Sequence, residues 1–519
     1  MLLALTRKEL LANLLTARLA LVLVFAVLLC GLAALAGSLD FSQRVKDYEE
    51  EVRRVEQGLE EATIYAEVRP HVVGPPEPLS IFSRGVDKGA GQRLSIQVSW
   101  ISASLGRLGS ADNRLMKRFV EIDFATVVRL LLSFMAVILG FDAICGDRER
   151  GTLRLMLANP VSRGAVVGGK LLGGALSLCG SMAVAFLFAL LILSFNPDVA
   201  FSGAEWVRLA LLLGVSCLFL VQVFAMSLAV STFVRGSATS LMLCLFGWLT
   251  LNLGYGNVLP SLSRYGVQEH TFQDFLNQNR QVRADVDREI REWEEKNPPP
   301  PEVYLRDITT GSRSRYGHSR AYEWRQGRNA HALEQHLDAS RRINQFQQAN
   351  YAPLAREATL VDDWSILSPF TNYQVLTKQL ARTTLAHKFQ LREAGYRYRA
   401  TFIDFLRGRE AFSSRRWFSD DPPEQEPLLP DPEALTPEDL AADSPFMKER
   451  MAWVQQQEAI AARQGRGLDL SDLPAFDPGW REPLSATLRK MTPGLLVTVL
   501  TTAAAVMLAV LRFLRYDPS

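Results

Sequence analysis

The sequence contains little cysteine. All five cysteines fall inside or at the end of a long apolar run: Cys30, Cys145, Cys179, Cys217 and Cys244. The long polar stretches contain none, so disulfides cannot hold them together, and each must be large enough to build a core of its own. No cysteine motif for a metal is present, and we expect no metal site.

Net charge and histidine are also low. With 57 Lys and Arg against 55 Asp and Glu, the net charge is +2, which gives no electrostatic reason to expect a nucleic-acid partner. Of the six histidines, His331 and His336 are five residues apart and do not form the H-E-x-x-H zinc pattern. The polar stretches also lack a G-x-S-x-G motif and a nucleophilic cysteine. We therefore predict a protein that is not an enzyme, has no catalytic residues and binds no cofactor itself.

The sequence is rich in long apolar runs. About 20 such residues in a helix cross a hydrocarbon core of about 30 Å. Six runs reach this length and predict a mainly α membrane protein with six transmembrane helices: Leu19–Ala36, Phe124–Cys145, Ala165–Phe195, Trp206–Phe233, Ala238–Leu259 and Pro493–Leu514. Because Ala34-Leu35-Ala36 resembles a signal-peptidase site, a cleaved signal peptide is the alternative for the first run, but that run is long for one.

Basic residues are distributed unequally between the connections. Residues 195–205 contain no Lys or Arg, whereas residues 1–18, 146–164 and the C-terminal end carry most of those that flank the runs. The positive-inside rule therefore places both termini and the 146–164 loop in the cytoplasm. Five regions follow: 1–37, an interfacial helix and the first span; 38–121, a smaller mixed α/β insert outside the cytoplasm; 122–262, spans two to five; 263–490, a large extracytoplasmic helical domain; and 491–519, the last span and a cytoplasmic tail.

The polar regions carry their own secondary-structure signals. Helical patterns predict helices at Phe41–Ala62, Gln268–Lys296, Tyr322–Arg356, Tyr373–Arg407 and Phe446–Gln464. Alternation over Arg93–Trp100 predicts a strand. Long helices with apolar stripes must pack on each other or on a partner, so an extracytoplasmic protein partner is a candidate.

A few polar residues and glycines interrupt the spans. A substrate path could use Asp142, Arg129, Gln222 and Asn252, although Asp142 and Arg129 also lie close enough to the ends of their span to reach interfacial water. The four-residue spacing of Gly169 and Gly173 predicts close helix packing, within one subunit or between two. Residues 164–171, GAVVGGKL, nearly match a phosphate-binding loop, but no strand precedes them and Leu171 replaces the magnesium-binding hydroxyl.

The segment FDAICGDRERGTLRLMLANPVSR, residues 141–163, lies between two spans. An ionised group at the bilayer centre costs several kcal/mol, so its charged residues must lie in water. Gly146 and Gly151 allow sharp turns and Pro160 stops a helix. The pattern predicts a short helix parallel to the membrane that a soluble partner can grip.

The same segment resembles the membrane permeases of ABC transporters of the type-2 exporter class. The resemblance rests on Phe141-Asp142, Glu149-Arg150-Gly151-Thr152-Leu153, Pro160-Val161-Ser162-Arg163 and Gly169-Lys170, with Arg7-Lys8-Glu9-Leu10 and Pro75-Pro76 as weaker matches. Within the class, the chain is similar to members with a large extracytoplasmic domain before the last span.

The resemblance implies a permease of the bacterial inner membrane, paired with a second copy or a paralogue and with two cytoplasmic ATPase subunits that hold ATP and Mg. The coupling contact to the ATPase would comprise Asp147, Arg148, Glu149, Arg150, Gly151, Thr152 and Leu153. Apart from membrane lipid, the partners would be proteins. The expected function is ATP-driven movement of an unknown substrate, with export favoured. The alternative is a permease that drives extracytoplasmic proteins mechanically without moving a substrate, and a static scaffold is a third hypothesis.

Overall fold

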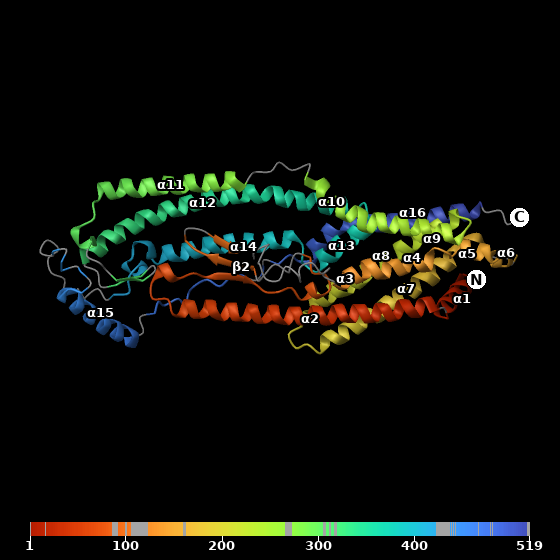
Figure 1. Ribbon diagram of the computed structural model, residues 1–519, viewed down its shortest axis with the longest axis horizontal. Helices are drawn as coiled ribbons and strands as arrows, with labels where there is room; N and C mark the ends of the chain where they lie inside the picture. The colour runs from red at the N-terminus through yellow and green to blue at the C-terminus, as the bar shows by residue number, and fades with distance from the viewer. Residues whose placement is uncertain are drawn as a thin grey trace.

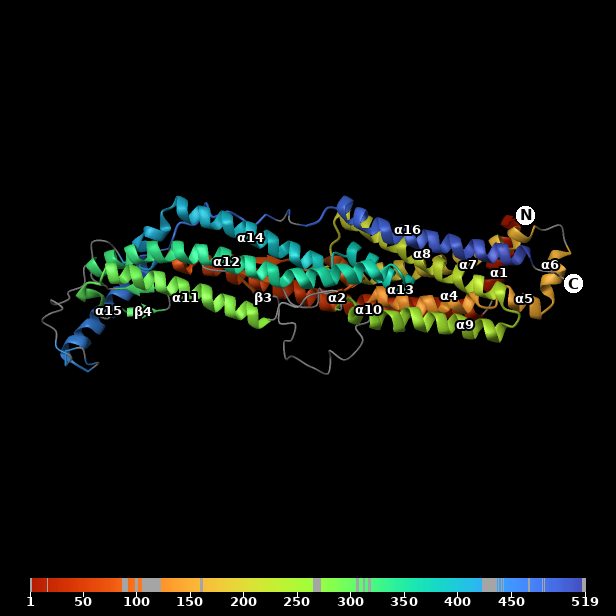
Figure 2. The ribbon, with the colours of Figure 1, turned by 90° about the horizontal axis from the view of Figure 1, so that it is seen from above.

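The protein is an elongated bundle of helices in the computed structural model (Figure 1). The described residues are 2–15, 17–85, 92–98, 101–104, 123–158, 162–264, 272–304, 308–310, 313–315, 319–421, 436, 438–439, 441, 443–464, 467–477, 479 and 481–515. Both chain termini lie at one end, which we call the terminal end, and the other end carries a helical extension, which we call the distal domain (Figures 1 and 2).

Six helices of the described chain are long and apolar enough to cross a membrane. The first is α2 (Ala17–Glu60), and the second, Phe124–Glu149, includes α3 (Phe124–Val127), the π-helical turn η4 (Val128–Leu132) and α4 (Ser133–Gly140). The third and fourth are α7 (Arg163–Ser194) and α8 (Gly203–Phe233). The fifth comprises α9 (Ser237–Leu249), the π-helical turn η5 (Thr250–Gly254) and α10 (Tyr255–Arg264), and the sixth is α16 (Leu484–Leu514). The N-terminal α1 (Leu2–Leu14) packs along α7.

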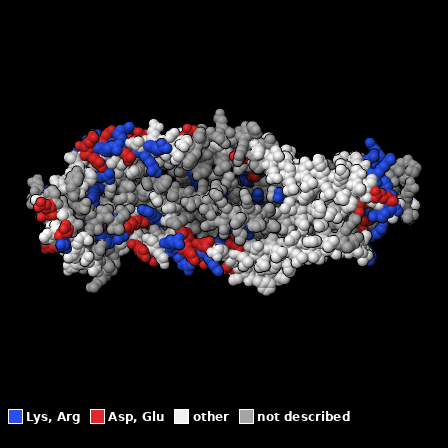
Figure 3. Space-filling model, in the orientation of Figure 1, with Lys and Arg blue, Asp and Glu red and all other residues white. Residues whose placement is uncertain are grey.

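Charged side chains mark the two ends of this bundle. In Figure 3, Lys, Arg, Asp and Glu gather at the terminal end and over the distal domain, and the face between them is nearly free of charged residues. Such an uncharged band is what a lipid-facing surface requires, because an ionised side chain in lipid is costly. Many large apolar side chains of the spans are accordingly exposed, such as Phe246 at 70% and Leu500 at 65%.

The distal domain is built from long helices and two small sheets. Its helices are the far half of α2, α11 (Phe272–Lys296), α12 (Ser319–Ser365), α14 (Leu385–Gly408) and α15 (Pro445–Gln464). Antiparallel strands β1 (His71–Gly74), β2 (Gln92–Ile96) and β3 (Ile101–Ser104) form one sheet, and β4 (Ile308–Thr310) pairs with β5 (Arg313–Arg315). Short 3-10 turns occupy Tyr65–Glu67, Pro78–Ile81, Pro301–Tyr304, Ala411–Ser413 and Arg415–Trp417. Its apolar core includes Leu94, Tyr322 and Phe402.

Several predicted elements differ from the structure. The first span and the predicted helix Phe41–Ala62 are one continuous helix, α2, because nothing between them breaks a helix. The strand predicted over Arg93–Trp100 is wrong in extent, since β2 ends at Ile96 and residues 99–100 lie outside the described residues. The single helix predicted over Tyr373–Arg407 is also wrong: α13 (Pro369–Leu380) ends in a turn at Arg382, whose φ is +57°, and α14 follows.

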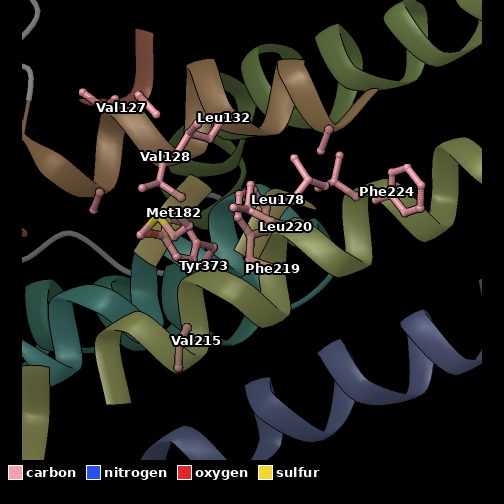
Figure 4. Packing of buried hydrophobic residues seen from close by; sticks show 14 of the residues in the cluster. Val127, Val128, Leu132, Leu178, Met182, Val215, Phe219, Leu220, Phe224 and Tyr373 are labelled. Carbon is pink, nitrogen blue, oxygen red and sulfur yellow. The ribbon is translucent and has the colours of Figure 1, made fainter. Parts of the chain in front are cut away.

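Helix α13 falls by sequence within the predicted outer domain, residues 263–490, but it lies beside the spans. It packs against α8, α16 and η5, within the bundle of spans. Its apolar face carries Phe370, Tyr373, Leu376 and Leu380, all at most 3% exposed and part of the core of the spans. Figure 4 shows Tyr373 beside Phe219 of α8 and Val128 of η4. A helix of 12 residues is too short to be recognised as a span.

Candidate functional site

The first candidate site is a helical turn at the terminal end, between the second and third spans (Figure 1). It consists of α5 (Cys145–Glu149) and α6 (Thr152–Leu157). Gly151 joins them with φ +73°, a left-handed conformation that favours glycine, whereas Gly146 lies within α5. Pro160, the predicted helix stop, lies outside the described residues.

The Asp147 carboxylate makes the contacts that hold this turn in place. The Asp147 carboxylate lies 2.6 Å from the Lys170 ammonium of α7 and 3.1 Å from the Arg150 guanidinium. It also accepts a 3.1 Å hydrogen bond from the Thr152 hydroxyl. Lys170 is 7% exposed and lies 3.3 Å from the Glu9 carboxylate of α1 as well. Because a buried cation is costly without such partners, Lys170 fastens the turn to α1 and α7.

The start of α5 is fastened to the end of α8. The Ser231 hydroxyl accepts hydrogen bonds from the backbone N–H groups of Ile144 and Cys145, at 3.0 and 3.1 Å. The Arg148 guanidinium donates to the carbonyl of Val234 at 3.1 Å. These bonds satisfy backbone groups that a helix end otherwise leaves open. The turn therefore has a fixed position relative to the fourth span.

Glu149 joins the turn to the fifth span. Its carboxylate accepts hydrogen bonds from the Ser237 backbone N–H at 2.8 Å and from the Ser237 hydroxyl at 2.6 Å. Ser237 is the first residue of α9, so a negative charge lies at the positive end of that helix, where it is favourable.

The predicted coupling residues divide into two groups. Leu153 is fully buried, and Asp147 and Arg148 are partly buried in the contacts above. Glu149, Arg150, Gly151 and Thr152 are exposed and form the accessible surface of the turn. Sequence reasoning did not connect Lys170, Ser231 and Ser237 to the turn, because these residues lie on other helices.

Gly169 and Gly173 lie against α1. A Cβ atom at Gly169 would stand 2.8 Å from the Cβ of Leu5, and one at Gly173 would stand 2.7 Å from the Cβ of Glu9. Both distances are shorter than normal contacts, so the small residues let α1 and α7 approach closely. Residues 164–171 are helical, as part of α7.

The polar residues predicted within the spans lie in different places. The Gln222 amide donates to the Thr501 hydroxyl of α16 at 2.5 Å, and Asp142 is partly buried near Gly146 at the terminal end. Arg129 lies in η4 and Asn252 in η5, near the distal end of the bundle. Arg129 and Asn252 therefore lie at a similar position along the bundle axis, near its distal end, away from Gln222 and Asp142.

The second candidate site is a cluster of charges at the distal end of the spans, which sequence reasoning missed. We call it the distal joint: Glu77, Glu205, Arg208, Arg382, Glu482 and Lys490. The Arg208 guanidinium of α8 is 2% exposed and donates to the carbonyls of Leu380 at 3.1 Å and Glu482 at 3.2 Å. Arg208 could have been recognised from the sequence, because a charged residue inside an apolar run is unusual.

The other ion pairs of the distal joint connect segments far apart in the sequence. The Arg382 guanidinium lies 3.1 Å from the Glu77 carboxylate and 3.2 Å from the Glu205 carboxylate. Lys490 of α16 lies 2.8 Å from Glu482. At Gly85, with φ +50°, a Cβ atom would overlap the Thr383 carbonyl, so only glycine fits beside this turn. The joint thus ties α8, α13 and α16 to the turn that leads into α14 of the distal domain.

His387 is an uncharged histidine that lies beside the distal joint. The His387 Nδ1 atom lies 2.7 Å from the Thr384 hydroxyl, and its Nε2 atom lies 3.5 Å from the Glu482 carboxylate. Burial lowers the pKa of His387 to about 4, although the charge of Glu482 acts in the opposite direction. Burial raises the pKa of Glu482, but hydrogen bonds from Lys490 and Gln390 outweigh it and hold that pKa below its usual range.

Comparison with known proteins identifies the family. Residues 3–518 match the model of the ABC-2 family transporter protein. Curated relatives include the probable ABC transporter permease protein NosY of Pseudomonas aeruginosa, 32% identical over 170 residues, which are 31% of this chain and 58% of the relative. The protein of the same name from Stutzerimonas stutzeri is 31% identical over 109 residues, 18% of this chain and 36% of the relative. The matched regions thus span less than two thirds of these relatives. The chain belongs to the ABC-2 family of transporter proteins, as a multi-pass transmembrane permease subunit.

Proposed function

We propose that the α5–α6 turn receives the motion of cytoplasmic ATPase subunits and passes it to the spans. The observation that carries this proposal is the set of contacts made by α5, because Lys170, Ser231 and Ser237 join it to three different spans. A partner that moves the turn must move α7, α8 and α9 with it. ATP binding supplies energy to such a motion only if the two conformations bind ATP differently.

The distribution of basic residues and the family support the orientation and the subunit composition that we propose next. The chain lies in the bacterial inner membrane with both termini and the α5–α6 turn in the cytoplasm and the distal domain outside. It pairs with a second copy or a paralogue, and the ATPase subunits hold ATP and Mg. The spans then rearrange so that an unknown substrate moves across the membrane, and we favour export.

The distal joint supports a second candidate function. Arg208 and Arg382 connect the spans to the turn between α13 and α14 through buried polar contacts. Buried ion pairs are costly to separate, so the spans and the first turn of α14 should move together. A permease built in this way can transmit motion to an extracytoplasmic protein without moving a substrate.

Arg150→Glu tests the coupling proposal, because it reverses the charge of an exposed residue of the turn. We expect loss of ATPase co-purification or at least about a tenfold loss of ATP turnover in the reconstituted complex, which is about 1.4 kcal/mol. Arg489→Glu is the matched control, since Arg489 is exposed at the distal end of α16. If both variants bind and stimulate the ATPase as the wild type does, the coupling proposal is wrong.

The second candidate requires a separate measurement. Spin labels at the exposed positions Glu56 of α2 and Arg342 of α12 report movement within the distal domain. Mechanical transmission predicts a distance change between ATP-bound and nucleotide-free complexes, and Arg382→Gln should reduce that change while ATP turnover continues. A wild-type complex that turns over ATP with an unchanged label distance would count against transmission and leave the coupling proposal standing.

A further inference from the structure

Two facing helices carry polar residues at the distal end of the bundle. The Trp248 indole N–H of α9 donates to the Ser133 hydroxyl of α4 at 2.9 Å. Arg129 lies four residues before Ser133, and Asn252 lies four residues after Trp248. Four residues return a side chain to the same helix face. Because the two spans run in opposite directions (Figure 1), Arg129 and Asn252 both lie one turn closer to the distal domain than this hydrogen bond.

Both residues lie in π-helical turns, η4 and η5. A π-helical turn inside an α-helix often marks a functional site. Helix α13 packs over the region of η4 and η5. The Ser368 hydroxyl at its start donates to the carbonyl of Leu251 in η5 at 2.8 Å. The ring of Phe370 also lies 6.4 Å from the ring of Trp248.

Asn252 has no hydrogen-bond partner in the part of the chain that the structure describes. It is 1% exposed, and neither its amide nitrogen nor its amide oxygen is bonded there. An unpaired buried amide is destabilising, because it has lost its hydrogen bonds to water without replacing them. Within the same described residues, the Nε atom of Arg129 is also buried without a partner.

A second cation, Lys378, lies on α13, the helix that packs against both η4 and η5. The charges of Arg129, Asp123 and Asp362 all act on it. The two oxygens of Asp123 already accept hydrogen bonds, from the backbone N–H of Thr126 at 2.7 Å and of Arg84 at 2.9 Å. No ion pair of Arg129 or Lys378 occurs among the residues that the structure places.

We propose that Arg129, Lys378 and Asn252 form a binding site for a phosphate group between the second span, the fifth span and α13. Two cations and an amide N–H₂ supply charge-assisted and neutral donors to one oxyanion. The phosphate can belong to a lipid headgroup at the distal membrane surface or to a small soluble anion. The site does not depend on the ATPase coupling proposed above.

The test uses the full-length protein in a neutral maltoside detergent and measures the shift of its thermal unfolding midpoint. Phosphatidylglycerol is compared with diacylglycerol of the same chains, and sodium phosphate with sodium chloride at equal ionic strength. A shift with phosphatidylglycerol alone indicates a lipid headgroup, and a shift with phosphate as well indicates a soluble anion. A wild type that responds equally to each ligand and its phosphate-free counterpart overturns the proposal.

Single-residue variants test which side chains produce the ligand-induced shift of the unfolding midpoint. Arg129→Gln and Lys378→Gln should each raise the ligand concentration at half-maximal shift about tenfold, because each removes one charge-assisted bond to the phosphate; tenfold corresponds to about 1.4 kcal/mol. Arg489→Gln, an exposed cation at the same end, should respond like the wild type. Unchanged responses in both site variants overturn the proposal.

Asn252→Leu separates ligand binding from a role in folding. It removes a buried unpaired amide, so without ligand it should unfold at a higher temperature than the wild type. With ligand, its response should be several-fold weaker. If Asn252→Leu lowers the midpoint without ligand and keeps the wild-type response, Asn252 is structural and the assignment is wrong.

Discussion

The phenol ring of Tyr373 lies face to face with the ring of Phe219, with centroids 4.4 Å apart and planes 12° apart. The Tyr373 hydroxyl lies 2.9 Å from the Ser216 hydroxyl, also on α8. A residue 157 positions from Ser216 is thus held in the middle of the spans. Any motion of α8 must carry α13 with it or break this contact.

Tyr373→Ala should therefore destabilise the spans themselves. Replacing a buried aromatic residue with alanine costs about 3–5 kcal/mol, because it removes apolar contacts and leaves a cavity. We expect a clear drop in the unfolding midpoint in detergent. Leu367→Ala is the control, since Leu367 is 73% exposed just before α13. Equal midpoints for the two variants would show that α13 is not part of the packed bundle.

Gly173→Ala should weaken the contact between α1 and α7. The added methyl group would meet the Cβ of Glu9 at 2.7 Å, and such overpacking costs about 1–3 kcal/mol. Gly180→Ala, on the same helix, meets no heavy atom within 4 Å and should instead stabilise, by up to about 1 kcal/mol from helix propensity. Chemical unfolding of the two variants gives the comparison, and a stabilised Gly173→Ala protein would refute the close contact.

Arg382→Gln should be much more damaging than the loss of an exposed pair. It leaves the buried carboxylates of Glu77 and Glu205 without this cation, which costs about 3–5 kcal/mol for a buried pair. Arg407→Gln breaks an exposed pair with Glu334 at 2.9 Å and should cost at most about 1 kcal/mol. Similar unfolding free energies for both variants would mean that the ion pairs of the distal joint contribute little to the stability of the fold.

Stability should fall as the pH is lowered from about 6.5 toward 4. His387 has a pKa of about 4 in the folded protein against an ordinary value of 6.5, so the unfolded chain binds the extra proton first. Stability from this group is complete above pH 6.5 and is lost as the pH falls toward 4. His387→Gln should flatten this part of the pH profile of the unfolding midpoint. A profile unchanged by the substitution would rule out His387 as its source.

Local patterns predict most of the helices. Long apolar runs and the segment 141–163 predict the six spans and the α5–α6 turn, and the glycine at 151 takes the left-handed turn its position suggested. Patterns of this kind depend on residues within one or two helical turns. They fail where a helix is both short and amphipathic, and α13 was therefore merged with α14 and assigned to the outer domain.

Neither candidate site could be completed from local patterns. Asp147 was recognised, but Lys170 was considered only in the false phosphate-loop match and in the family resemblance, never as the partner of Asp147. Arg208 lies inside an apolar run, and the carbonyls that receive its hydrogen bonds are 172 and 274 residues away. Ion pairs at such separations leave no periodic signal.

The sequence by itself determined that six segments of this chain are long and apolar enough to cross a membrane, because a bilayer excludes charge and unpaired backbone groups over a fixed thickness. It also determined where a water-exposed turn must interrupt the spans. Only the tertiary structure decided that α13 lies among the spans and that Arg208, Arg382 and their carboxylates meet at one level. The physical reason is that membrane insertion depends on the composition of one segment, whereas burial of a charge depends on partners that the folded chain brings together.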